Sequence, residues 1–348
     1  SALSLVHAFI GYACVMWMRA RIAPRPVHAA DRTPDVAIVL VAYNAAAELP
    51  AKLANLLALD YPAQRLAIHV ASDGSEDLTA ALLEACTDPR VHAHVFPQRR
   101  GKSACLGDVV SRLDAEIVVF TDVRQRLDAD AVRALMRPFA DPAVGAVSGE
   151  LSFEPTPGGV AGGADAYWRY EKFIRRNEAA SGSVVGVSGA LYAARRALLP
   201  RIPAALILDD LWIPLEIARS GARIVFAADA RAWDRPPTDA ALEARRKRRT
   251  LAGNFQLIAR DPKLLLPWCH PLGWRLWGHK WLRLLAPWAL LTMLATNIAL
   301  APVSARWGLL LLAQAAFHAI AIAGLGEPAL LRHLPVRMAT TFVRMNAY

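Results

Sequence analysis

The 348-residue chain is long enough for one large domain or two modest ones, and 55% of its residues are hydrophobic while only 20% are charged. This composition excludes a fully soluble enzyme and indicates membrane-embedded segments. The formal net charge of +10 is concentrated beside the most apolar runs, which favours anionic lipid headgroups over nucleic acid. The cysteines form no CxxC pair and indicate buried thiols in a reducing compartment rather than a zinc site.

The first apolar run, residues 3–18, is short for a complete membrane span, and Arg19, Arg21 and Arg25 follow it. A secretory signal peptide would carry its positive charge before the apolar run, so residues 1–20 are predicted to be an N-terminal anchor. The positive-inside rule then places the following region in the cytoplasm. Because the chain begins with serine and is apolar at both ends, the anchor is expected to be partial.

Between residues 30 and 260, short β-rich runs alternate with helical stretches, which predicts an α/β domain with an open, mostly parallel sheet flanked by helices. The predicted strands are residues 36–42, 66–72, 91–96, 116–121, 144–149 and 223–228, and the predicted helices include 46–58, 76–86, 102–113 and 128–139. A Pro- and Gly-rich stretch at 153–165 interrupts the pattern. It is expected to be a loop over the sheet edge, either covering a ligand or simply mobile.

Two aspartates follow predicted strands, where parallel sheets bind their ligands. Asp73 opens a turn after the second strand; it is either a ligand for a nucleobase, a ribose or a metal-bound diphosphate, or an ordinary turn and helix cap. Asp122 follows the fourth strand and is either a hard oxygen ligand for Mg²⁺ or Mn²⁺ or a simple turn residue.

Further along, small and basic residues precede predicted helices. Lys102, after Gly101, is placed to reach phosphate groups, although the glycine spacing of a P-loop is missing. Ser188 and Gly189 lie in a small-residue turn ahead of a predicted helix, where the backbone can approach a sugar or simply allow close helix packing.

Asp209 and Asp210 open a predicted helix, where they either stabilise the helix terminus or supply a general base. The basic run at 245–249 includes Arg248 and Arg249. At helical spacing its members cannot all face one ligand, so one or two are expected to neutralise a diphosphate and the others to contact lipid headgroups or solvent.

The C-terminal part predicts membrane association. Residues 261–283 mix Trp with Arg and Lys, which is typical of an interfacial amphipathic segment; an ordinary amphipathic core helix is the alternative. The runs 284–303 and 307–325 are each about long enough to cross a bilayer, so residues 284–348 are expected to hold transmembrane helices and a truncated C-terminal segment. The expected protein is a multi-pass component of the inner or plasma membrane.

Nine motifs in this order resemble the family 2 glycosyltransferases, and most closely their membrane-integrated branch of cellulose, chitin, hyaluronan and poly-N-acetylglucosamine synthases. The resemblance covers roughly residues 36–260. The motifs are VAYN (41–44), LLALDYP (56–62), SDGSED (72–77), RGKSACL (100–106), FTDVRQ (120–125), GAVSGEL (145–151), VSGALYA (187–193), LDD (208–210) and RRKRRTLAGNFQ (245–256).

The resemblance implies a GT-A fold and inverting, metal-dependent sugar transfer from a nucleotide-diphosphate donor, usually UDP-linked, to a growing exopolysaccharide or a lipid-linked saccharide. It implies that Asp210 is the base, with support from Asp209, and that Asp122 holds Mg²⁺ or Mn²⁺. Ser188 and Gly189 are expected on the acceptor side. The residues expected to bind the donor are Tyr43, Asn44, Asp73, Lys102, Arg248 and Arg249.

The sequence also departs from the family pattern. Ala45 and Ala46 stand where acidic residues are usual, Arg124 replaces the second carboxylate of the DxD motif, and Thr250 replaces the tryptophan of the QxxRW motif of processive members. Two alternatives therefore stay open: a polyprenyl-phosphate monoglycosyltransferase, and a catalytically inactive scaffold that binds nucleotide sugar. Membrane lipids are expected partners, and a second copy or an export protein is a possible one.

Overall fold

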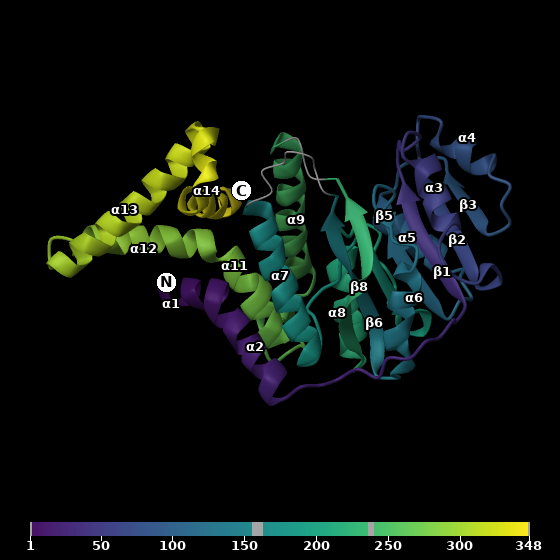
Figure 1. The fold of residues 1–348 in the computed structure, drawn as a ribbon, viewed down its shortest axis with the longest axis horizontal. Helices are drawn as coiled ribbons and strands as arrows, with labels where there is room; N and C mark the ends of the chain where they lie inside the picture. Colours follow the sequence, from purple (N-terminus) through teal and green to yellow (C-terminus); the bar gives the residue numbers. More distant parts are fainter. Residues whose placement is uncertain (1, 155–162, 236–239, 347–348) are drawn as a thin grey trace.

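A computed structural model describes residues 2–154, 163–235 and 240–346 (Figure 1). A mixed sheet with helices on both faces forms one side of the molecule. The N-terminal helices and the C-terminal helices lie together on the other side, so both chain ends are at this second, helical region.

In the described ranges the sheet has eight strands, in the order β3-β2-β1-β4-β7-β6-β8-β5. The strands β3, β2, β1 and β4 are parallel neighbours, whereas β7 pairs antiparallel with both β4 and β6. β6 and β8 are parallel, and the short β5 is antiparallel to β8. Their bounds are β1 (Val36–Ala42), β2 (Leu66–Asp73), β3 (Val91–Phe96), β4 (Ile117–Thr121), β5 (Arg126–Leu127), β6 (Val144–Phe153), β7 (Leu191–Arg195) and β8 (Arg223–Asp234).

Helices cover both faces of the sheet and build the helical region. The α-helices are α1 (Ala2–Val6), α2 (Tyr12–Ile22), α3 (Leu49–Leu57), α4 (Thr79–Glu84), α5 (Lys102–Val110), α6 (Ala131–Met136), α7 (Gly163–Ala180), α8 (Asp209–Arg219), α9 (Ala240–Arg260), α10 (Gly273–Leu276), α11 (Leu282–Leu284), α12 (Ala286–Leu300), α13 (Ala305–Gly326) and α14 (Leu334–Asn346). The shorter turns are η1 (His7–Gly11), η2 (Ala63–Arg65), η3 (Arg137–Ala140), η4 (Arg196–Leu198), η5 (Pro262–Leu265), η6 (Trp277–Trp281) and η7 (Pro328–Arg332).

The hydrophobic pattern explains these layers. β1 reads VAIVLVA without a polar residue because it lies inside the sheet and is covered on both faces. Leu49, Leu53 and Leu56 of α3 recur at helical spacing and are buried against one face, together with α4 and α6. The helices α5 and α8 pack on the other face, and Trp281 from the membrane-proximal segment joins the same core.

The predicted fold class is confirmed, and the described residues add two strands that were not predicted, the two-residue β5 and β7. The stretch after Ser188, predicted as a turn leading to a helix, is the antiparallel strand β7, and this prediction was wrong. Leu191 to Ala194 are fully buried between β4 and β6, so burial on both faces outweighs the helix propensity of alanine. The expected loop at 153–165 falls largely outside the described residues, and α7 begins at Gly163.

Among the described residues, two helices in the helical region are long and apolar enough to cross a membrane, Ala2–Ile22 and Ala305–Gly326. The predicted span at 284–303 corresponds to α12, which is bent by 58° against Gly273–Leu284; the bent pair would make a third, broken span. The N-terminal helix runs through α1, η1 and α2, over the residues predicted to be an anchor.

The segment 261–283 combines both predicted alternatives. Trp268 is 78% exposed, as an interfacial residue would be. Arg275, His279 and Trp281 are buried, which is the core-helix alternative. Arg275 donates to the backbone oxygens of Glu178 (2.8 Å) and of other residues at the end of α7, so this part of the segment is joined to the α/β domain.

Candidate active site

The carboxyl ends of β1 and β2 carry Asn44 and Asp73 into two loops that are hydrogen-bonded together. Asn44 has a positive φ of 47°, and its Oδ1 accepts from the backbone N–H of Glu76 at 2.9 Å. Asp77 accepts from the N–H of Ala46 (3.0 Å) and of Thr79 (3.0 Å), the first residue of α4. Asn and Asp are well suited to such turns because their short side chains bond nearby backbone.

Asp73 is buried and holds the loop that precedes α5. Its carboxylate accepts from the backbone N–H of Arg100 at 2.6 Å and of Gly101 at 2.9 Å. Gly74 makes this approach possible, because a Cβ there would lie 2.3 Å from the backbone nitrogen of Arg99. The guanidinium of Arg99 in turn lies 3.9 Å from the ring centroid of Tyr43. Both loops expected at the donor are therefore adjacent and rigidly linked.

Lys102, at the first position of α5, forms ion pairs with two carboxylates, one that follows β4 and one at the start of α8. Its Nζ lies 2.9 Å from Oδ1 of Asp122, after β4, and 3.4 Å from Oδ2 of Asp209, at the start of α8. Burial alone would lower the pKa of Lys102, but Asp122 and Asp209 outweigh it and raise that pKa above its usual range. The structure thus brings Asp209 to Lys102 and Asp122, from which it is more than 80 positions distant in the sequence.

Asp210 lies next to this cluster, beside the 186–189 loop. A Cβ added to Gly189 would be 3.2 Å from Oδ2 of Asp210, so the absence of a side chain at 189 makes room for the carboxylate. Burial and the neighbouring Asp209 raise the pKa of Asp210 to about 6, against the opposing charge of Lys102. A carboxylate whose pKa is moved toward neutrality by its surroundings is suited to general-base chemistry.

Ser188 has a structural contact in this loop. Its backbone N–H donates to Oγ of Ser148 on β6 at 3.0 Å, and its side chain is buried. Ser188 therefore fixes the loop that carries Gly189 beside Asp210.

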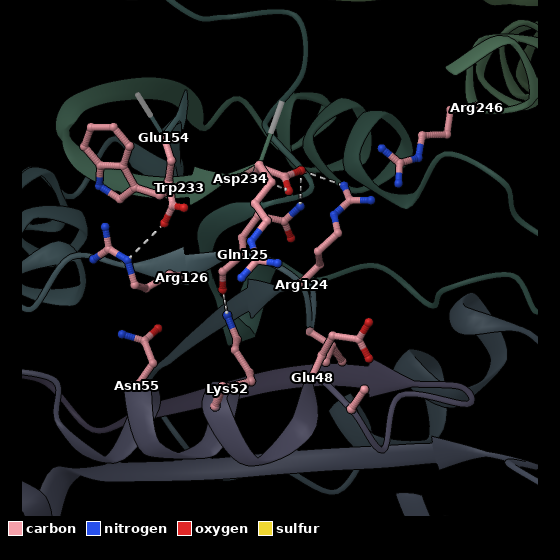
Figure 2. A pocket seen from close by; sticks show the side chains of 14 residues that line it. Glu48, Lys52, Asn55, Arg124, Gln125, Arg126, Glu154, Trp233, Asp234 and Arg246 are labelled. Atoms are coloured by element: carbon pink, nitrogen blue, oxygen red, sulfur yellow. Dashed lines mark hydrogen bonds and ion pairs between the residues drawn. The ribbon is translucent and has the colours of Figure 1, made fainter. Parts of the chain in front are cut away.

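The basic residues of α9 point in different directions from the helix, and they differ in whether they line a cavity. Arg248 and Arg249 are exposed, and neither lines the cavity between α3 and the ends of β6 and β8, whereas Arg246 does. Figure 2 shows Arg246 reaching from α9 toward Arg124. Arg246 is thus the member of the run that lines this cavity.

Arg124, at the second DxD position, forms an ion pair with Asp234. Its guanidinium lies 2.7 Å from Oδ2 of the buried Asp234, at the end of β8, and the same oxygen accepts from Nε2 of Gln125 at 3.0 Å (Figure 2).

Within the described ranges, no group of three His, Cys, Asp or Glu side chains has the geometry to hold a metal ion. Asp122 is 42% exposed, and Lys102 contacts only its Oδ1. A single exposed carboxylate fits a metal that shares its coordination with phosphates and waters, as Mg²⁺ usually does, and does not fit a preformed cage.

Sequence reasoning missed three residues around the cluster. Lys52, on the buried face of α3, binds the backbone oxygen of Gln125 (2.6 Å) and was hidden in an apolar helix pattern. Asp234 lies beyond the predicted strand 223–228, because β8 continues to Asp234. Lys280 comes from the membrane-proximal segment; its Cε lies 3.9 Å from the position of a Cβ on Gly186, beside Asp210. Only the interruption of an apolar face by Lys52 was visible in the sequence.

A family model described as "Glycosyltransferase like family 2" matches residues 34–253. The chain belongs to glycosyltransferase family 2. The predicted family and enzyme class are therefore confirmed, and the match contains every motif on which the prediction rested, except the last three residues of the final one. The match does not distinguish the membrane-integrated synthase branch, which stays a prediction.

Among solved structures, the family 2 chain is similar to a mannosyltransferase, PcManGT from Pyrobaculum calidifontis, in complex with GDP-Man and Mn²⁺. The two share 25% identity at a TM-score of 0.72, over 99% of this chain and 97% of the other. This similarity confirms the GT-A fold and extends over the helical region.

Curated relatives match a smaller part. An N-acetylglucosaminyltransferase of Rhizobium leguminosarum bv. trifolii is 30% identical over 34% of this chain and 67% of its own length. A beta-monoglucosyldiacylglycerol synthase of Synechocystis sp. is 25% identical over 40% of this chain and 32% of its own length. The chain thus matches about two thirds of the first relative and about a third of the second.

Proposed function

We propose that this glycosyltransferase inverts the anomeric centre in a single displacement, with Asp210 as the base. The observation that carries the proposal is the half-buried Asp210 carboxylate beside Gly189, next to the Lys102–Asp122–Asp209 cluster. The acceptor hydroxyl oxygen bonds to the anomeric carbon while its proton passes to Asp210. The bond between that carbon and the diphosphate oxygen breaks, and the nucleoside diphosphate leaves. Asp209 holds Lys102 in place between the two carboxylates.

The donor is a nucleoside-diphosphate sugar. Tyr43, Asn44 and Asp73 form the nucleoside side of the site, and Lys102 neutralises phosphate charge. UDP is the expected nucleoside diphosphate, and the GDP-Man carried by the mannosyltransferase makes GDP the first alternative. Arg248 and Arg249 would approach the diphosphate only if α9 turned them inward. Asp122 would hold Mg²⁺ or Mn²⁺, which supplies positive charge to the diphosphate.

The acceptor is a growing polysaccharide or a lipid-linked saccharide that reaches Asp210 beside Ser188 and Gly189. Two apolar helices support attachment to a membrane, with residues 30–260 as a cytoplasmic catalytic domain, 261–283 at the interface and the chain ends in the bilayer. The name of the Synechocystis relative, a lipid glycosyltransferase, favours a lipid-linked acceptor.

The test is nucleoside-diphosphate release by the detergent-purified chain against a panel of UDP-sugars and GDP-mannose, with Mn²⁺, Mg²⁺ or EDTA. Asp210→Asn should lower release with the preferred donor by about 100-fold or more, because a neutral amide takes no proton. Asp60→Asn, which changes a 61% exposed carboxylate outside the site, is the matched control. Release that is equal in the two variants would contradict the proposal, as would release that is independent of any sugar donor.

A further inference from the structure

A cavity of about 560 Å³ lies between α3 and the ends of β6 and β8, with the 123–126 segment in its wall. Figure 2 shows Glu48, Lys52 and Asn55 rising from α3 on one side and Glu154, Trp233 and Asp234 on the other. The volume is in the range of small-molecule sites. The cavity wall is connected in sequence to the carboxylate cluster, because Val123 and Arg124 in the wall directly follow Asp122.

The lining is predominantly basic. Five Lys or Arg side chains and three Asp or Glu side chains contribute to it. Two of the acidic groups are already neutralised: Asp234 by Arg124 at 2.7 Å, and Glu154 by Arg126 at 3.6 Å. The cavity therefore presents an excess of positive charge to whatever it holds, which suits an anion.

Lys52 is the most unusual group in the wall. Its side chain is 2% exposed, and Nζ binds Oγ1 of Thr121 (3.1 Å) and the backbone oxygen of Gln125 (2.6 Å). Across the part of the chain that the structure describes, no carboxylate lies within ion-pair distance of this ammonium. Burial lowers the pKa of Lys52 to about 7, and an anionic ligand in the cavity would stabilise the charged form by supplying the partner that this ammonium lacks.

A second buried group lacks a partner among the described residues. Within those ranges, Oε1 of Gln125 accepts no hydrogen bond, although Nε2 of the same amide donates to Asp234. Gln125 is 3% exposed and lines the cavity. A hydroxyl or water carried by the ligand would satisfy this acceptor, since leaving it unpaired costs about 1–3 kcal/mol.

We propose that this cavity is a phosphoryl-binding site, with Lys52 and Arg124 as its principal cationic ligands. Arg124 presents a planar guanidinium, a geometry that matches phosphate oxygens, and Asp234 holds it in place. The replacement of the second DxD carboxylate by arginine thus converts a metal-ligand position into an anion-binding one. The phosphoryl group belongs either to the donor diphosphate or to a phosphate of a lipid-linked acceptor, and this choice of sources rests on the proposed function.

Calorimetric binding to the full-length, detergent-purified chain tests the site without turnover. The probes are UDP, GDP and farnesyl phosphate, each with wild type, Lys52→Met and Arg124→Gln. The matched control is Arg133→Gln, since Arg133 is 43% exposed and paired with Asp60, as Arg124 is 45% exposed and paired with Asp234, but Arg133 does not line the cavity. Unchanged melting temperatures would show that the variants fold.

If both cavity variants bind UDP and GDP at least about ten-fold more weakly but bind farnesyl phosphate with unchanged affinity, the donor is the phosphoryl source. The same weakening for farnesyl phosphate alone identifies the acceptor, and weakening for both ligands supports the site for both sources. Wild-type affinity for all three probes in both variants would overturn the proposal, as would no saturable binding of any probe to the wild-type chain. Because no sugar is transferred, the base function of Asp210 can fail while this site stands, and the converse also holds.

Discussion

The ammonium of Lys102 lies 2.9 Å from Oδ1 of Asp122, so a cation at the start of α5 neutralises the carboxylate at the end of β4. The Lys102→Met change removes this charge and the contact with Asp209. Nucleotide affinity, measured by calorimetry with UDP and GDP, should fall about 30-fold, which corresponds to a charged hydrogen bond of about 2 kcal/mol. Lys172→Met is the matched control, because Lys172 forms a similar, 25% exposed pair with Glu150. Equal losses in the two variants would show a general effect of charge.

The activity of the transferase should depend on pH through Asp210. Burial and Asp209 raise the pKa of Asp210 to about 6, and only the deprotonated carboxylate accepts a proton. The value of kcat/KM should therefore be constant above about pH 7 and fall about ten-fold per unit below about pH 6. Asp209→Asn removes the neighbouring negative charge, so the acid limb should move to lower pH. If the acid side of the pH profile of kcat/KM stays in place or moves to higher pH, the result would argue against the coupling of the two aspartates.

A methyl group at position 189 should disturb the base directly. In Gly189→Ala the new Cβ would lie 3.2 Å from Oδ2 of Asp210, tighter than most contacts, and the carboxylate would have to turn away. We expect kcat to fall about ten-fold or more with little change in melting temperature. Gly107→Ala in α5 is the control, since its Cβ would lie at an ordinary contact distance of 3.4 Å from the backbone oxygen of Ile202. Full activity in Gly189→Ala would place the reacting atoms elsewhere.

Metal affinity should depend on the nucleotide. Asp122 is the one carboxylate of the DxD position, since Arg124 replaces the other, so Mn²⁺ alone should bind weakly. Addition of UDP or GDP supplies phosphate oxygens, and the Mn²⁺ dissociation constant should then fall at least about ten-fold. The loss of the free Mn²⁺ signal in electron paramagnetic resonance measures this. Asp122→Asn should abolish the gain, and a tight site without nucleotide would contradict the argument.

The junction between α7 and the membrane-proximal segment should be important for stability. Arg275 is 4% exposed and donates to the backbone oxygens of Glu178, Ser181 and Ser183. Arg275→Met removes the hydrogen bonds to these three buried oxygens, of which that of Glu178 still accepts from the N–H of Ser181 at 3.2 Å, and the loss should cost about 2 kcal/mol or more and lower the melting temperature in detergent. Arg196→Met, at an exposed arginine with one backbone contact, should change it little. Equal melting temperatures would mean that water replaces the lost donor.

The sequence predicted the parts of this molecule that depend on local pattern. The strands β1 to β4 are apolar runs bounded by turns, and the aspartates after β2 and β4 mark the carboxyl edge of the sheet. β7 was not predictable in this way, because LYAAR becomes a strand only through its pairing with β4 and β6 on either side. Propensity is a weak signal where burial on both faces decides the structure.

The candidate site divides in a similar manner. Asp122, Asp209 and Lys102 are separate motifs in the sequence, and their prediction as one site rested on the family resemblance. Lys52 and Asp234 belong to no motif. Their importance comes from contacts with the 121–125 segment, made by a helix and a strand that lie far from it in the chain. Such long-range contacts leave little trace in a single sequence, except for a charged residue on an otherwise apolar face.

The N-terminal helix bears on how the protein is made. The hydroxyl of Tyr12 donates to Oε1 of Glu178 at 2.5 Å, a residue synthesised 166 positions later, and His279 reaches the same oxygen at 2.9 Å. The first helix therefore leaves the ribosome long before its partners exist. The α/β domain can form in the meantime, but the three elements meet only when residue 279 has been added. Assembly of this junction is thus completed late in biosynthesis: a chain that ends before residue 279 can pair Tyr12 with Glu178 of α7, but it lacks the histidine that binds the same carboxylate.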